Sequence, residues 1–411
     1  MTTFRTESVA PDTSVFAEPR GACAGWDVFR RCGAKGPIAA VVQGDRPKLY
    51  SAGAFEPVAA ERLIPVGTGP WAGFVSYEIG HLLEPTSTAR RPGLAGTGVH
   101  ADAAWGMGGW LKLEPASGEA GPEASCKLGE LHSAWGRDAY TKAVARVVEL
   151  IHAGDAYQAN LTHALVGTVA GSTRALFADL AQAASPAFGC YLELPALADG
   201  RRRAVLGLSP ELLVRYDATT RQLTTEPMKG TRPATDSGLH DLRVAEKDKA
   251  ELAMIVDLMR NDLGRVSEVG SVSVQEPRII QRHGPDTAGV WQASGRVVGT
   301  LRDGLTLHDA LCALLPAGSI TGAPKVRAMQ MIHELEPHPR GPYCGALGMI
   351  DAEGNAELAV GIRTAVVVGD ELRYSVGAGI VADSDPQAEW AETLSKAGPL
   401  RAIGARIWDD R

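Results

Sequence analysis

ELAVGIRTAVVVGDELRYSVGAGIVA, residues 357–382, is the stretch that decides the fold. Apolar and β-branched residues on each side of Gly369 and Asp370 are typical of two strands joined by a tight hairpin turn. Strands in hairpin order predict antiparallel sheets with helices packed outside them, instead of the parallel sheet that alternating strands and helices form. We therefore expect an α+β fold.

The chain on either side of this hairpin adds elements of both kinds. Further strands are predicted at 37–43, 71–83, 158–167, 189–195, 203–210, 212–217, 271–274, 292–301 and 344–351. Helices are predicted at 138–154, 246–263, 322–337 and from about Pro386 onward. The first helix places Tyr140, Val144 and Ile151 at helical spacing and ends at Gly154.

Length and composition limit the possible classes. The 411 residues exceed a single core of roughly 250–300, so two domains or one large layered domain are expected. Because the Gly-, Ala- and Glu-rich segment 117–130 is expected to be a loose connection, we predict an N-terminal α+β region at 1–130 that contributes to the sheet core. The catalytic region is then expected at 131–411.

Charge and cysteine usage argue against several partners. The net charge is −7 with dispersed basic residues, so nucleic acid is not expected as a partner. No apolar run approaches the roughly 18 residues that would span a membrane, and the polar N-terminus does not resemble a signal peptide. The six cysteines lack metal-site spacing and are expected to be reduced thiols; they are Cys23, Cys32, Cys126, Cys190, Cys312 and Cys344. These features favour a cytoplasmic protein.

The last predicted helix, in SDPQAEWAETLSKAG, carries two carboxylates and an ammonium on one face: Glu389, Glu392 and Lys396. Its start is expected at Asp385 and Pro386, with a capping box from Ser384 to Gln387 as an alternative. The charged face is either a solvated salt-bridged stripe or part of a site. The preceding Gly377-Ala378-Gly379 favours a site, because such a segment can bring backbone amides close to an anion.

A second acidic pair, Asp248 and Glu251, lies on the predicted helix 246–263. The two acidic helices could converge on Mg²⁺, which prefers a few carboxylates together with water and substrate oxygens, or each could be a solvated face.

GSITGAPK, 318–325, does not match a phosphate loop and is expected to be a turn with Thr321 as helix cap. Lys229 in EPMKGTRP is either a solvated charge at the end of a strand or a reactive amine.

A set of motifs resembles the chorismate-utilising enzymes, which comprise anthranilate synthase component I, aminodeoxychorismate synthase component I, isochorismate synthase and salicylate synthase. These motifs occur in family order over about 150–400: YQANLT (157–162), LSPE (208–211), EPMKGTRP (226–233), AELAMIVDLMRNDLGRV (250–266), GSITGAPK (318–325), GIRTA (361–365) and GAGIVADSDPQAEWAETLSKA (377–397). The resemblance implies an anthranilate synthase component I-like fold, in which two antiparallel sheets pack together with helices outside.

The resemblance also implies a site for chorismate. Mg²⁺ would be held by Glu251 and Glu392, with Glu389 close by and Asp248 as a weaker candidate. Further matched positions would contact the substrate and its carboxylates; these are Gly230, Thr231, Tyr343, Arg363, Gly377, Ala378, Gly379 and Lys396.

Two positions divide the family by reaction. Isochorismate and salicylate synthases carry a lysine base where this chain has Gln158, so addition of water is disfavoured here. Anthranilate synthases usually carry alanine where this chain has Lys229, which is the signature of aminodeoxychorismate synthases. Lys229 would attack C2 of chorismate, Glu211 would protonate the departing C4 hydroxyl, and ammonia would add at C4 and expel the lysine. Gln292 stands where many members have a histidine, and an amide cannot shuttle a proton.

The resemblance predicts 4-amino-4-deoxychorismate synthesis for 4-aminobenzoate and folate, with ammonia from a separate glutamine amidotransferase subunit. Three alternatives remain at this point. The chain could be anthranilate synthase component I, or it could make aminodeoxychorismate for a secondary-metabolite pathway. It could also be a non-catalytic regulatory partner of a glutaminase.

Overall fold

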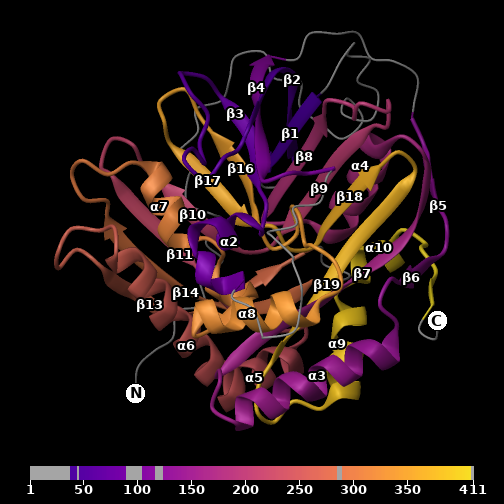
Figure 1. Ribbon diagram of the computed structural model, residues 1–411. Coiled ribbons are helices and arrows are strands. Elements are labelled where there is room, and N and C mark those ends of the chain that lie inside the picture. Colours follow the sequence, from indigo (N-terminus) through magenta and orange to yellow (C-terminus); the bar gives the residue numbers. More distant parts are fainter. Residues whose placement is uncertain (1–37, 44–45, 89–103, 116–123, 285–288, 409–411) are drawn as a thin grey trace.

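The computed structural model describes residues 38–43, 46–88, 104–115, 124–284 and 289–408, and it confirms an α+β fold (Figure 1). The strands are β1(Ile38–Gln43), β2(Arg46–Pro57), β3(Trp71–Val75), β4(Gly108–Pro115), β5(Cys126–Leu128), β6(Leu131–Ser133), β7(Gln158–Gly171), β8(Phe188–Leu194), β9(Arg203–Ser209), β10(Leu212–Tyr216), β11(Gln222–Glu226), β12(Met228–Pro233), β13(Ser273–His283), β14(Val290–Thr300), β15(Gly322–Ala323), β16(Ala346–Ile350), β17(Ala356–Val360), β18(Thr364–Val368), β19(Glu371–Ile380) and β20(Ile407–Trp408). The α-helices are α2(Ile79–Leu83), α3(Arg137–His152), α4(Thr173–Ala184), α5(Asp236–Val244), α6(Glu246–Gly264), α7(Leu307–Leu314), α8(Lys325–Leu335), α9(Pro386–Ser395) and α10(Gly398–Ala402), and the short 3₁₀ helices are η1(Pro85–Thr88) and η2(Gly318–Ile320).

The hairpin that decides the fold forms as predicted. β18 pairs with β19 from Val368 opposite Glu371 onward, and Gly369 at the turn has a φ of 61°, a left-handed conformation that glycine adopts without steric cost. β19 then pairs with β7 along its whole length, which places Gly377 opposite Thr162 and Gly379 opposite Asn160. This register brings two of the predicted site motifs side by side.

The strands form one continuous network of pairings. It runs from β13 through β14, β11, β10, β17, β16, β3, β4, β2, β1, β8, β9, β18 and β19 to β7, and these pairings are antiparallel. β12 joins it through β14, which places Thr231 opposite Gln292. The N-terminal strands β1 to β4 therefore lie in the middle of the network, and the division into regions 1–130 and 131–411 stays a prediction.

The network folds back on itself, so two layers face each other. Leu192, Val205 and Val366, from β8, β9 and β18, share a buried cluster with Phe74 and Leu347, from β3 and β16. The expected packing of two antiparallel layers is present, but the layers are not separate sheets because strand pairing continues from one into the other.

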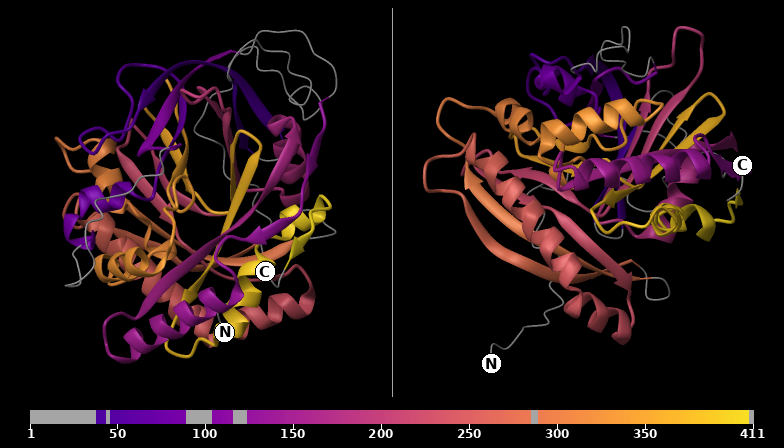
Figure 2. Two further views of the ribbon diagram at one scale, coloured as in Figure 1. Left: turned by 45° about the vertical axis from the view of Figure 1, so that its right-hand side comes forward. Right: turned by 60° about the horizontal axis from the view of Figure 1, so that its bottom comes forward.

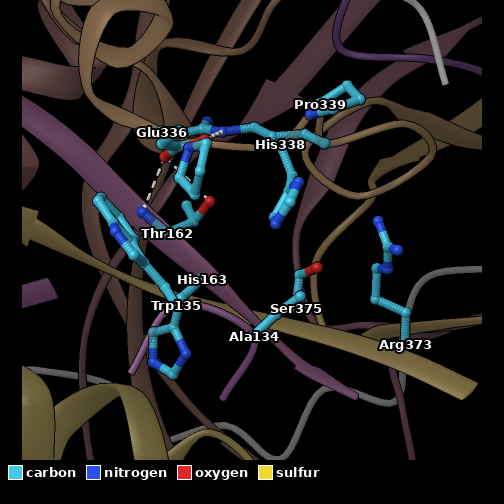
Figure 3. A pocket seen from close by; sticks show the side chains of 12 residues that line it. Ala134, Trp135, Thr162, His163, Glu336, His338, Pro339, Arg373 and Ser375 are labelled. Carbon is cyan, nitrogen blue, oxygen red and sulfur yellow. Dashed lines mark hydrogen bonds and ion pairs between the residues drawn. The ribbon is translucent and has the colours of Figure 1, made fainter. Parts of the chain in front are cut away.

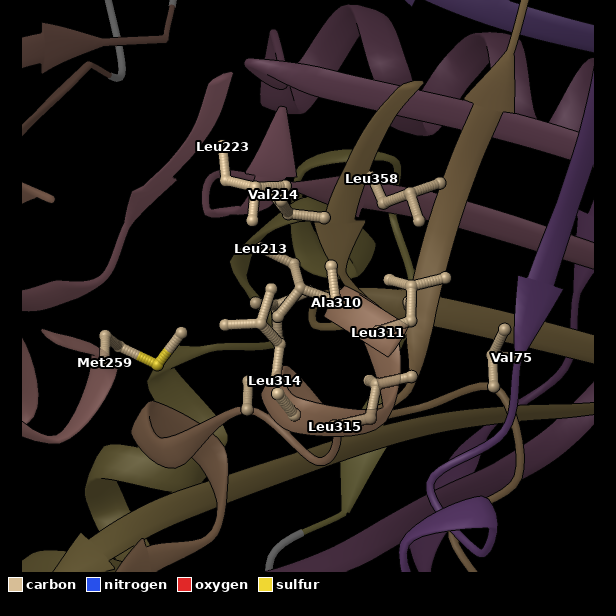
Figure 4. Close-up of a cluster of buried hydrophobic side chains, with 14 of the residues drawn as sticks. Val75, Leu213, Val214, Leu223, Met259, Ala310, Leu311, Leu314, Leu315 and Leu358 are labelled. Carbon is tan, nitrogen blue, oxygen red and sulfur yellow. The ribbon is translucent and has the colours of Figure 1, made fainter. Parts of the chain in front are cut away.

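Helices cover the outside of both layers (Figures 1 and 2). On one layer α3, α4, α8 and α9 pack on β7, β9 and β19 through a second buried cluster. On the other, α6 and α7 pack on β10, β14 and β17; Figure 4 shows Leu311 and Leu314 of α7 near Leu213 and Leu358. Burying a leucine side chain contributes roughly 1.5–3 kcal/mol, so these apolar faces fix where each helix lies.

Four local expectations were wrong. Residues 71–83 are not one strand, because β3 ends at Val75 and α2 follows. Part of the expected loose connection 117–130 pairs with β7 as β5. The capping box from Ser384 to Gln387 does not form, since the Asp385 side chain caps α9. Thr321 does not cap α8, because Pro324 occupies that position and the Thr321 hydroxyl donates to Ala317 O.

Other expectations agree with the described residues. Asp385 and Pro386 begin α9 as predicted. Cys126, Cys190, Cys312 and Cys344 are free thiols, while Cys23 and Cys32 lie outside the described residues. Within the described ranges, no helix is both long and apolar enough to cross a membrane.

Candidate active site

Lys229 is enclosed between two elements and is not a solvated charge at a strand end. Its Nζ lies 2.9 Å from Glu251 Oε2 on α6, and its side chain is 21% exposed. A Cβ added at Gly379 of β19 would lie 2.6 Å from the same Nζ and 2.8 Å from Gln158 Nε2. The amine therefore lies directly over β19, and a side chain at position 379 would displace it.

Glu211 is a buried carboxyl group in the turn between β9 and β10. It is 3% exposed, and Ser319 Oγ donates a 2.5 Å hydrogen bond to its Oε1. Burial raises the pKa of Glu211 to about 7, and the nearby charge of Lys229 offsets this only in part. A carboxyl group with this pKa carries a proton for part of the time at neutral pH, as a general acid requires.

Glu251 of α6 and Glu392 of α9 lie near the same two lysines, Lys229 and Lys247. Burial alone would raise the pKa of Glu392, but Lys396, at 3.0 Å, and the charges of Lys229 and Lys247 hold it below its usual range. Lys247 Nζ is also 3.9 Å from Glu251 Oε1. The structure therefore brings Glu251 and Glu392 close to Lys229, although their helices are far apart in sequence.

Glu389 lies beside this pair and has its own partner. It is 7% exposed, and Ser384 Oγ donates a 2.6 Å hydrogen bond to its Oε1. Burial and the charge of Glu392 raise its pKa. Asp248 is placed differently, because it is ion-paired with Arg232 at 2.9 Å and lies against Gly230.

The carboxylates fit a hard divalent cation. No three acidic, histidine or cysteine side chains gather into a ready-made metal centre in the part of the chain that the structure describes. Mg²⁺ usually takes only one or two protein carboxylates and completes its shell with water and substrate oxygens. Glu251 and Glu392 are donors of this kind, and the lysines beside them show that the position attracts positive charge.

The glycines of β19 have a steric role in addition to the predicted one. A Cβ at Gly377 would lie 2.6 Å from Thr162 Cγ2 and 2.9 Å from Leu161 O, so the close pairing with β7 needs a glycine there. Lys396 Nζ donates a 2.6 Å hydrogen bond to Gly377 O. Ala378 lies between the two glycines and is fully buried. Binding of a carboxylate by their amides stays a prediction.

Two buried glutamines have side-chain amides without protein partners. Gln158 is 0% and Gln292 2% exposed, and neither amide forms a hydrogen bond within the described residues. A buried polar group left without a partner costs about 1–3 kcal/mol, so such groups usually face a ligand or water. Gln158 lies beside Lys229 and Gly379, and Gln292 is opposite Thr231 in the β12–β14 ladder.

Backbone features position three further predicted site residues. These are Lys229 in β12 and Tyr343 and Arg363 in loops. Gly230 has a φ of 94°, which favours glycine. Tyr343 is buried, and burial raises its pKa well above the usual value. Cys344 N donates to Gly361 O at 2.9 Å, which ties the loop after Tyr343 to the segment before Arg363.

Ser319 and Lys247 are site residues that the sequence reasoning missed. Ser319 lies within the quoted GSITGAPK segment, whose turn brings its hydroxyl to Glu211. Lys247 precedes Glu251 by one helical turn, a spacing visible in the sequence.

Comparison with known proteins gives a consistent result. A profile of the family described as chorismate binding enzyme matches residues 41–402. Anthranilate synthase component 1 of Streptomyces coelicolor is 42% identical over 264 residues, 63% of this chain and 50% of that protein. Aminodeoxychorismate synthase component 1 of Escherichia coli is 39% identical over 270 residues, 64% of this chain and 57% of that protein. The chain thus spans about half the length of the relatives it matches.

Solved structures share the fold. Anthranilate synthase component I from Streptococcus pneumoniae superposes with a TM-score of 0.65 at 23% identity, covering 95% of this chain and 94% of that one. The menaquinone-specific isochorismate synthase of Escherichia coli gives a TM-score of 0.67 at 19% identity, covering 92% and 90%. Enzymes with different products therefore have this architecture, and the product must be argued from the site.

Proposed function

Because the chain belongs to the chorismate binding enzyme family, we propose that it acts on chorismate as an aminodeoxychorismate synthase component I. The product would be 4-amino-4-deoxychorismate, a precursor of 4-aminobenzoate and folate. The position of Lys229 supports this proposal most directly: its amine lies over Gly379, beside the unpartnered amide of Gln158.

The chain's own residues account for both displacements. Lys229 Nζ forms a bond to C2, the ring double bond shifts, and the C4 hydroxyl leaves as water with a proton from Glu211. Ammonia then bonds to C4, the double bond shifts back, and the C2–N bond to Lys229 breaks. Breaking the C2–N bond returns the neutral Lys229 amine, and the Glu211 carboxylate takes a proton from the new ammonium at C4, so that both residues are regenerated and the amino group remains at C4.

Glu251 and Glu392 would hold Mg²⁺, which neutralises a substrate carboxylate when bound. Lys229 needs its neutral form to attack, and an ordinary lysine is almost entirely charged at neutral pH. Lys229 Nζ is ion-paired with Glu251 Oε2 at 2.9 Å, so the proposed nucleophile and the proposed metal share a carboxylate.

Gln158 supports amination over hydration. An amide cannot accept a proton from water as a basic amine can, so the site lacks a base at this position. Ammonia would come from a separate glutamine amidotransferase.

Anthranilate synthesis is the second candidate, and it is supported by the names of several relatives. Lys229 favours the first candidate, because anthranilate formation does not need a lysine adduct at C2. Supply of aminodeoxychorismate to a secondary-metabolite pathway would use the same chemistry. A non-catalytic partner of a glutaminase would have no use for the buried, protonatable Glu211.

Mass spectrometry of the product tests the proposal. Wild type and Lys229→Ala are incubated with chorismate, Mg²⁺ and ammonium at alkaline pH, with the exposed Lys142→Ala as control. Wild type and the control should form aminodeoxychorismate, and Lys229→Ala should lose it or form anthranilate. Anthranilate or isochorismate from the wild type would overturn the proposal.

A further inference from the structure

His163 is a buried titratable side chain that the proposed reaction does not use. It lies on β7 and is 4% exposed. Figure 3 shows Thr162 beside Glu336 and the His163 ring on the opposite side of the strand, as the alternation of side chains along a strand requires. On that side the ring contacts α9. His163 therefore joins β7 to the helix that carries Glu389 and Glu392.

Both ring nitrogens of His163 form hydrogen bonds. Nε2 lies 2.8 Å from the hydroxyl oxygen of Thr393 on α9, and Nδ1 lies 3.0 Å from Ser133 Oγ. The ring also stacks on Trp390 of α9, with 4.7 Å between the ring centres and 18° between the ring planes. Each of these two α9 residues directly follows a predicted carboxylate of the site in the sequence.

The directions of these hydrogen bonds fix which nitrogen of His163 carries the hydrogen. The Thr393 hydroxyl donates its proton to Trp390 O at 2.7 Å, so toward His163 it can only accept. Nε2 is therefore the N–H group, and Nδ1 accepts from the Ser133 hydroxyl. Ser133 Oγ in turn accepts from Gly136 N at 3.1 Å. Burial lowers the pKa of His163 to about 3, so the ring is neutral at neutral pH.

The hydrogen bond to Thr393 is a buried attachment of α9 to β7. At the start of the helix Arg137 donates to Gln387, but this contact is exposed. Beyond the last turn Tyr374 donates to a backbone carbonyl at 3.2 Å. Thr393 lies between these two points and adjoins Glu392. A fixed Thr393 therefore also fixes the place from which the Glu392 side chain extends.

We propose that His163 is a positioning residue for the metal site, where its Nε2–H group holds Thr393 and thereby sets the Glu392 carboxylate for Mg²⁺. The proposal rests on the metal site of the proposed function. Mg²⁺ demands near-ideal octahedral geometry, so a ligand whose helix can shift binds it less tightly. The stack on Trp390 and the hydrogen bond to Thr393 are separate contacts, so substitutions can remove one and keep the other.

Titration calorimetry of Mg²⁺ binding to the free enzyme, without chorismate, tests this role. His163→Phe keeps an aromatic ring against Trp390 but loses both hydrogen bonds, and it should weaken Mg²⁺ binding about five- to tenfold. His163→Gln should restore most of the affinity, because its amide nitrogen lies near the place of Nε2 and can donate to Thr393. His163→Asn should not restore it, since the shorter side chain reaches only toward Ser133. The exposed His132→Gln is the matched control and should have no effect.

A double-mutant cycle separates positioning from a general loss of stability. Thr393→Val removes the hydroxyl, nearly keeps the side-chain volume, and should weaken Mg²⁺ binding as much as His163→Phe does. The double variant should bind Mg²⁺ no more weakly than either single variant, because both substitutions remove the same hydrogen bond. Urea unfolding reports the stability of each variant separately. If His163→Phe does not fold, Thr393→Val and the comparison of His163→Gln with His163→Asn decide the question.

Equal Mg²⁺ affinity in wild type, His163→Phe and Thr393→Val would overturn the proposal, and so would tighter binding by His163→Asn than by His163→Gln. Absence of Mg²⁺ binding to wild type would overturn it together with the metal site. If the affinity follows the hydrogen bond but wild type forms no aminodeoxychorismate, the proposed function fails and the role of His163 stands. If aminodeoxychorismate forms and Mg²⁺ binding is unchanged in the variants, the role of His163 fails alone.

Discussion

Lys229 Nζ lies 2.9 Å from Glu251 Oε2, so the proposed nucleophile is ion-paired with a proposed ligand of Mg²⁺. The Glu251 carboxylate cannot pair fully with the Lys229 ammonium and bind Mg²⁺ at the same time. Lys229 and Mg²⁺ should therefore compete for Glu251.

Replacement of Lys229 by methionine should tighten Mg²⁺ binding roughly tenfold, because the metal no longer displaces an ammonium from a partly buried carboxylate. Titration calorimetry without chorismate measures this, and Lys142→Met is the exposed control. Weaker or equal binding in Lys229→Met would show that Glu251 does not hold the metal.

Glu211→Gln should slow adduct formation by about 10²–10⁴-fold, the usual contribution of a general acid. Only protonated Glu211 can donate, and its pKa is raised to about 7. The ratio of wild-type to Glu211→Gln rates should thus be largest below pH 7 and fall as pH rises through 7. Intact-protein mass spectrometry of the chorismate adduct without ammonia gives both rates. A ratio that does not change between pH 6 and 9 would exclude this role.

The same substitution, although it slows the reaction, should raise the free energy of unfolding relative to wild type at high pH. A carboxyl group whose pKa is raised in the folded state contributes stability at low pH and loses it as pH rises through about 7. Urea unfolding at pH 6 and pH 8 should show Glu211→Gln gaining stability relative to wild type at the higher pH. A gain of equal size at both pH values would mean that Glu211 is not the titrating group.

Gly379→Ala should reduce kcat at least tenfold while the protein stays folded. The new methyl group would lie 2.6 Å from Lys229 Nζ and 2.8 Å from Gln158 Nε2, which are the movable ends of side chains. Gly398→Ala is a matched control, since no atom lies within 4 Å of its added Cβ. Activity and circular dichroism of both variants check the prediction; full activity in Gly379→Ala would place the reacting amine elsewhere.

Lys325 and Asp262 form a buried ion pair of 2.5 Å that joins α8 to α6. Lys325→Met alone should cost about 3–5 kcal/mol, because it leaves a buried carboxylate without its partner. Lys325→Met combined with Asp262→Leu should recover much of this loss. Urea unfolding measures both; additive losses in the double variant would contradict the assigned pairing.

Short-range sequence patterns predicted the helices and strands better than they predicted the side-chain contacts between them. The β18–β19 hairpin and the start of α9 at Asp385 follow from turn and cap chemistry within a few residues. The hydrogen bond from Ser319 to Glu211 joins residues that are 108 positions apart, and no short-range pattern encodes such a contact. Only the resemblance to the chorismate-utilising enzymes placed Glu251 and Glu392 in one site. The spacing of residues on one helix does not tell which other helix that helix faces.

The strand network has two ends, and the candidate site lies where they meet. Lys229 belongs to β12 at one end and Gly379 to β19 near the other, and no ladder among the described strands joins β12 to β19 or β7. Among the described strands no pairing spans this seam, and the Lys229 side chain of β12 lies across it against Gly379 of β19. Replacement of Lys229 by alanine would therefore remove the proposed nucleophile and a contact between the two ends of the strand network at once.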